Sequence, residues 1–156
     1  MSKLGFWVAV SVVSLGAAVG AWYYKYQLYG WLPSTASSEL KNVDGLLMDK
    51  DGKPFTGRVK DISDSGYSLY AYKDGKLDGL NVVFSEGQLR EIGHWENGEQ
   101  NGLFEAWTDK GVLVDHGIFK DGERDGETVQ YWPDTGKLKV KAQYRAGKLN
   151  GLVEQY

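Results

Sequence analysis

A motif of eight residues recurs from residue 72 onward, and it constrains the fold more than any other feature. Each copy starts with an aromatic residue, passes through a pair ending in glycine, and closes with Asp or Asn before a second glycine. The four copies are Tyr72–Gly79, Trp95–Gly102, Phe119–Gly126 and Tyr144–Gly151. Counted from Gly57, the closing glycines are spaced by 22, 23, 24 and 25 residues. Such a period indicates stacked structural units. One unit cannot bury its apolar face by itself, but neighbouring units bury it together.

The dipeptides inside the motif indicate tight turns. Asp74-Gly75, Asn97-Gly98 and Asp121-Gly122 favour the two-residue type I′ turn, in which both central residues need positive φ. The fourth copy carries Ala146-Gly147 instead, so we expect a different turn there. The segments between turns are short and rich in β-branched and aromatic residues, which predicts strands. The residues we assign to the repeat framework are Tyr72, Gly75, Gly79, Trp95, Gly98, Gly102, Phe119, Gly122, Gly126, Tyr144, Gly147 and Gly151.

A second aromatic residue follows each closing glycine by five positions. These residues are Phe84, Trp107, Tyr131 and Tyr156, and Ile62 holds the same place after Gly57. We expect them to pack between strands. The step from this position to the next glycine grows from three to four to five residues, so one connecting loop lengthens along the chain.

The longest of these loops contains Trp132 and Pro133. Trp132 directly follows Tyr131, so its ring is expected on the other face, where an exposed Trp is a plausible contact for a protein partner. The alternative is that Trp132 packs over its own turn.

The sequence therefore predicts an all-β domain over residues 46–156, an elongated single-layer antiparallel β-meander of stacked hairpins. Residues 43–56 are interpreted as a degenerate leading hairpin that turns at Asp51-Gly52. Residues 32–45, which include Pro33 and several Ser residues, are interpreted as a linker.

Residues 1–31 carry the signal of one transmembrane helix. The 21 residues from Leu4 to Tyr24 contain no charge, and the following aromatic residues are typical of a membrane interface. A cleaved signal peptide is a second interpretation, with Lys3 as its basic region and Ala18-Val19-Gly20 as its cleavage site. A buried helix of a soluble protein is a third. We prefer the retained anchor because the apolar run is long and leads directly into the aromatic residues.

The positive charges near the membrane segment set its expected orientation. Lys3 and the α-amine lie on the N-terminal side, and Lys25 alone lies close on the other. This bias places the N-terminus in the cytoplasm. We therefore expect a single-pass protein of the bacterial cell membrane, with the repeat domain on the outer side, periplasmic or extracellular.

The repeats resemble the MORN family, and they are most similar to the bacterial variant found in antitoxin-type proteins. The stretches that carry the resemblance are YKDGKLDG, WENGEQNG, FKDGERDG and YRAGKLNG. It covers about residues 46–156. The resemblance implies a curved antiparallel β-meander with no catalytic role. It also implies protein binding, in some members as an antitoxin or immunity-type partner.

Composition and motifs exclude several classes of function. Residues 32–156 hold 16 Lys and Arg against 21 Asp and Glu, a net charge of −5, which disfavours nucleic-acid binding. The absence of Cys excludes disulfides and thiolate metal sites. His94 and His116 are the only histidines; they are candidates for partner binding on one face, and two histidines alone make no metal site. No catalytic, cofactor or metal-binding residues are predicted.

Two classes of function remain open at this point. The first is a membrane-tethered module that binds another protein, either a toxin or the subunits of a membrane complex. The second is a structural scaffold of the cell envelope, and a carbohydrate-binding protein that uses aromatic side chains is a further alternative.

Overall fold

The structure is a computed structural model that describes Gly30 and residues 32–156, apart from the side chain of Leu152. The expected membrane anchor, its cleavage site and its orientation lie outside the described residues. Within the described part, no helix is both long and apolar enough to cross a membrane.

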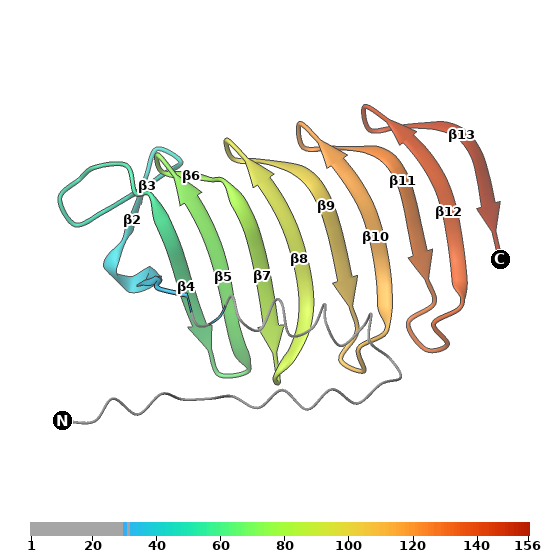
Figure 1. Cartoon of the computed structure of the whole chain (residues 1–156), viewed down its shortest axis with the longest axis horizontal. Coiled ribbons are helices and arrows are strands. Elements are labelled where there is room, and N and C mark those ends of the chain that lie inside the picture. Colours follow the sequence, from blue (N-terminus) through green and yellow to red (C-terminus); the bar gives the residue numbers. More distant parts are fainter. Residues whose placement is uncertain (1–29, 31) are drawn as a thin grey trace, which may run out of the picture.

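The described chain is all-β and folds as one large, mostly antiparallel sheet of consecutive hairpins (Figure 1). The sheet follows the order β1-β4-β5-β7-β8-β9-β10-β11-β12-β13, β6 pairs with β5, and β2 and β3 form a separate small sheet. The elements are β1 (Thr35–Ala36), η1 (Ser37–Glu39), β2 (Lys41–Val43), β3 (Leu46–Met48), β4 (Gly57–Ser63), β5 (Gly66–Lys73), β6 (Lys76–Leu77), β7 (Gly79–Ser85), β8 (Gln88–Glu96), β9 (Glu99–Trp107), β10 (Leu113–Lys120), β11 (Glu123–Tyr131), β12 (Leu138–Arg145) and β13 (Lys148–Gln155). The predicted succession of hairpins is therefore confirmed.

The four motif turns lie together at one edge of the sheet, which we call the turn edge (Figure 1). Both central residues have positive φ in every one: 50° and 80° at Asp74-Gly75, 52° and 93° at Asn97-Gly98, 51° and 79° at Asp121-Gly122, 47° and 70° at Ala146-Gly147. The expectation that Ala146-Gly147 turns differently is wrong. An Ala in this left-handed region costs about 1 kcal/mol, so the neighbouring hairpin must impose the turn.

A backbone hydrogen bond from each turn glycine supplies that constraint. The N–H of Gly98 donates to the carbonyl of Leu77 in the preceding hairpin over 2.8 Å. The same bond runs from Gly122 to Gln100 and from Gly147 to Arg124, each 3.0 Å long. In all three, the acceptor lies two residues beyond the preceding turn glycine, so the bonds lock successive hairpins together at the turn edge.

The closing glycines lie directly opposite the motif aromatics in neighbouring strands. The aligned pairs are Gly57 with Tyr72, Gly79 with Trp95, Gly102 with Phe119 and Gly126 with Tyr144. Gly102 has φ +115°, a region that other residues avoid, and a Cβ there would lie 3.1 Å from the Cβ of His94. The backbone register thus places each closing glycine opposite the aromatic of the next hairpin, whereas a Cβ added to Gly102 would meet His94 within its own hairpin.

The two faces of the sheet carry different side chains. One face, which we call the core face, holds the buried cluster of Leu69, Val82, Phe84, Leu89 and Ile92. Tyr67 stacks on Phe84 there, with 5.0 Å between the ring centroids. The other face, the repeat face, carries the motif aromatics, and Phe104 meets Phe119 edge-on at 5.9 Å.

The leading segment contains the expected turn and one more hairpin before it. Met48 bridges Pro54 in antiparallel fashion across the Asp51-Gly52 turn, as expected. The additional hairpin, β2–β3, turns at Asp44-Gly45, another dipeptide of the type I′ class, within the segment interpreted as a linker. Asp51-Gly52 does lie in a turn, which the Asp49 carboxylate stabilises by accepting the N–H of Asp51 over 2.9 Å.

Part of the expected linker also carries regular structure. Within residues 32–45, β1 pairs in parallel with β4, aligning Thr35 with Val59. The hydroxyl of Ser37 donates to the Asp61 carboxylate over 2.8 Å. These bonds attach the segment to the first long strand of the sheet.

We predict that Gly102→Ala lowers the free energy of unfolding by about 2–3 kcal/mol, because the new Cβ meets both an unfavourable φ and the Cβ of His94. The matched control is Gly111→Ala, where φ is +74° and no atom lies within 4 Å; its loss should be about 1 kcal/mol. Urea unfolding of the full chain measures both. Equal losses would contradict this account of the closing glycine.

Candidate protein-binding face

The second aromatics of the repeat form a row on the core face, near the edge opposite the turns. Phe84 is 3% exposed, Trp107 and Tyr131 are half-buried, and Tyr156 is 68% exposed. Trp107 aligns with Leu113, and Tyr131 aligns with Leu138. The row therefore begins in the buried cluster and becomes accessible over β9–β13. The expectation that these residues pack inside the sheet holds for Phe84 and for Trp107, which packs against the buried cluster, and is wrong for Tyr156.

A parallel row runs through the middle of the core face, where each residue aligns with the next across the strands. Its members are Lys60, Leu69, Val82, Ile92, Glu105, His116, Val129, Lys141 and Glu154. The members on β5–β8 are apolar and buried, whereas charged side chains dominate from Glu105 onward. The middle of this face thus changes from apolar to mainly charged between β8 and β9.

Ion pairs and hydrogen bonds join the charged members to one another or to neighbouring side chains. His116 Nδ1 lies 2.9 Å from Glu105 Oε1, and the Glu105 side chain is only 12% exposed. Lys141 Nζ lies 2.9 Å from Glu127 Oε2. The hydroxyl of Tyr156 donates to Glu154 over 2.8 Å.

We call this surface the acidic-aromatic face and define it by residues of β9–β13 and Tyr156. Its members are Glu105, Trp107, Leu113, His116, Glu127, Val129, Tyr131, Leu138, Lys141, Glu154 and Tyr156.

The carboxylates perturb two neighbouring groups. The hydrogen bond and charge of Glu127 raise the pKa of Lys141 above its ordinary value. The hydrogen bond to Glu154 raises the pKa of the Tyr156 phenol. Both shifts favour the protonated form, so Lys141 stays cationic and Tyr156 stays neutral at physiological pH.

The two histidines lie on the core face, as expected, but they do not meet. His94 on β8 aligns with Leu80, and its Nδ1 lies 3.2 Å from the carbonyl oxygen of Leu103. His116 on β10 instead contacts Glu105 on the intervening strand. Only His116 belongs to the acidic-aromatic face.

Trp132 and Pro133 occupy the exposed loop between β11 and β12. Trp132 is 43% exposed, and its Nε1–H donates to the carbonyl of Tyr156 over 3.4 Å. The ammonium of Lys139 lies 4.7 Å from the Trp132 ring centroid. The side chain therefore packs against Lys139 of its own hairpin and the C-terminal residue and still presents surface to solvent. Its role as a contact for a protein partner stays a prediction.

Sequence reasoning missed the carboxylates and Lys141, although a signal for two of them exists. The position two residues before the second aromatic holds Lys60, Val82, Glu105, Val129 and Glu154 in successive repeats. It belongs to the middle row, so its charge or apolarity sets the local character of the core face. Glu127 and Lys141 follow no such spacing.

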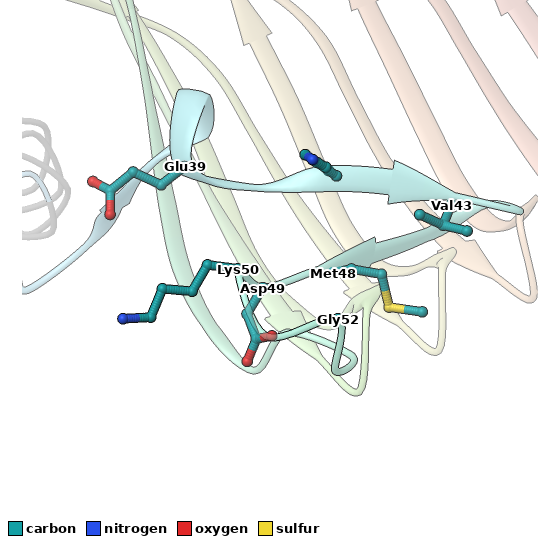
Figure 2. Close-up of a pocket in the computed structure, with 7 residues that line it drawn as sticks. Glu39, Val43, Met48, Asp49, Lys50 and Gly52 are labelled. Atoms are coloured by element: carbon teal, nitrogen blue, oxygen red, sulfur yellow. The ribbon is translucent and has the colours of Figure 1, made fainter.

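The leading hairpin contains an open pocket of about 480 Å³ lined by Glu39, Lys41, Val43, Met48, Asp49, Lys50 and Gly52 (Figure 2). The charged ends of Glu39 and Lys50 lie on the side away from Val43 and Met48, so they do not converge on the apolar part. Asp49 already accepts backbone N–H groups. Among the described residues, no three His, Asp or Glu side chains are grouped to hold a metal ion.

No protein-family model matches the sequence, and no curated protein shows a significant match to it.

We predict that Glu127→Gln lowers the pKa of Lys141 toward its ordinary value, because it removes the carboxylate that raises it. In the wild type, the interaction of protonated Lys141 with Glu127 stabilises the fold fully at pH values below the ordinary lysine pKa. This stabilisation is lost as the pH rises through the raised pKa of Lys141. NMR titration of the Lys141 side chain measures the shift, with Lys120 at the turn edge as a control. An unchanged Lys141 pKa would contradict the pairing.

Proposed function

We propose that the protein is a non-catalytic binding module that docks another protein on the acidic-aromatic face. The observation that carries this proposal is the change along the core face, from buried apolar side chains on β5–β8 to mainly half-buried aromatic and charged ones on β9–β13, among which Val129 alone is buried. Accessible aromatic side chains bordered by charged groups are typical of protein interfaces. The aromatic side chains provide contact area, and the charged groups orient the partner.

The scaffold supports the same function. Backbone hydrogen bonds and glycine contacts link the hairpins, so the side chains of the face are held on strands and not on loops. The resemblance of the repeats to the MORN family also favours protein binding. On that basis, the partner is a toxin held by an antitoxin or immunity-type protein, or a subunit of a membrane complex.

We further propose that residues 4–24 tether the module to the bacterial cell membrane, with the sheet on the outer side. The support is the run of 21 uncharged residues and the aromatic residues that follow it.

A second candidate function is binding of a linear envelope glycan. The second aromatics supply one ring per hairpin, so neighbouring rings are two strands or about 10 Å apart. This spacing is close to the length of a disaccharide unit in an extended β-linked chain, and aromatic rings stack well on sugar faces. The carboxylates beside the row favour the protein partner.

Site-specific photo-cross-linking tests the docking proposal. A photoreactive phenylalanine analogue replaces Tyr131 on the acidic-aromatic face or, as a control, Val153 on the repeat face of β13. In cells, we expect one protein adduct of defined mass at Tyr131 and none at Val153. Equal adducts at both positions, or none at Tyr131, would refute docking on this face.

Alkaline extraction of native membranes tests the tether. The full chain should stay in the membrane pellet, and its intact mass should include residues 1–31. Release into the supernatant, or a mass that begins near Ala21, would refute the retained anchor.

A further inference from the structure

We propose that the partner presents a basic amphipathic α-helix, laid across strands β9–β13 on the acidic-aromatic face. This inference rests on the proposed function and specifies the chemistry of the docked element.

The apolar part of the face sets the direction of the ligand. Trp107, Leu113, Tyr131 and Leu138 are half-buried and lie on four consecutive strands of the sheet. Their row crosses the strands at right angles to the chain direction. A ligand with an apolar stripe covers the whole row only when it also runs across the strands.

The charges on the same face, of which Glu127 lies furthest from the apolar row, set the charge that the ligand must carry. Glu105, Glu127 and Glu154 provide three carboxylates, and Lys141 is the one lysine or arginine among the residues that define the face. Glu127 and Glu154 flank Lys141, and Glu154 accepts its hydrogen bond from an uncharged phenol. The surplus of negative charge complements a cationic element, which it also steers during association.

The spacing of the two rows favours a helix over an extended strand. The middle row lies two residues from the apolar row along β9 and β11 and three residues along β10 and β12, where the register shifts, so the rows are about 7 Å apart. A helix has a diameter of about 10 Å, so it covers both rows at once, with its apolar stripe on one and its basic stripe on the other. Five strands span about 19 Å, which corresponds to about 13 helical residues.

A designed peptide tests this inference on the full chain in neutral detergent. The probe is a helix of about 14 residues in which Leu forms one stripe and Lys the adjacent one. One control peptide has the same composition in scrambled order, and another has Glu in place of Lys. Surface plasmon resonance on the immobilised protein, with empty micelles in the reference channel, gives the dissociation constants.

Glu127→Gln with Glu154→Gln should weaken binding of the Leu–Lys helix at least ~10-fold, equivalent to about 1.4 kcal/mol. The matched variant, Glu96→Gln with Glu99→Gln, removes the same charge at the turn edge and should change binding less than about 2-fold, because surface pairs beyond a Debye length are screened. Tyr131→Ser should also weaken binding without altering its salt dependence.

Three results would overturn the inference. They are equal binding by the scrambled or Glu peptide, an unchanged affinity of the Glu127 and Glu154 double variant, and an equal loss in the turn-edge variant. If any of these occurs while the cross-linked adduct at Tyr131 persists, the protein docks a partner of other chemistry and the proposed function stands. Loss of the adduct removes the proposed function as well.

Discussion

The fold depends on one hydrogen bond that recurs between neighbouring hairpins, from the N–H of a turn glycine to a carbonyl just beyond the preceding turn. The bond forms only when the turn presents that N–H toward its neighbour, and the type I′ geometry with two positive φ values provides this presentation. The requirement is strong enough to hold Ala146 in the left-handed region. A lone hairpin is only marginally stable, and these hydrogen bonds allow each hairpin to stabilise the next one.

The closing glycine and its opposite aromatic complete this framework and leave the rest of each repeat free to vary. Both framework elements act at or near the turn edge, and the motif aromatics occupy the repeat face. The repeat motif therefore does not restrict which residue types occupy the middle of the core face. Its middle row changes from Val82 to Glu105 without disturbing the stacking, so surface chemistry varies while architecture stays constant.

The sequence predicts what depends on local chemistry and misses what depends on register. Turn dipeptides and glycine spacing predict the hairpins correctly, since each turn is decided within a few residues. The shared face of His94 and His116 was predicted, but a full assignment of side chains to faces was not possible, because bulges such as the one between Gly93 and Trp95 shift the alternation along a strand. Asp44-Gly45 carried a readable turn signal that the interpretation of a linker obscured. The pairing of Glu127 with Lys141 needed the register of β11 against β12.

Burial along the core face is unequal, which indicates that the strands β5–β8 stabilise the sheet and that the strands β9–β13 are available for binding. Leu69, Val82 and Ile92 are at most 1% exposed and cannot contact a partner without unfolding. A buried cluster stabilises its own strands and, through the hairpin-to-hairpin bonds, the strands that follow. The strands β9–β13 are held in place by these hydrogen bonds. They can therefore carry charged and partly exposed side chains that would not form a stable core by themselves. Recognition is thus expected in the half of the sheet whose side chains contribute least to its stability.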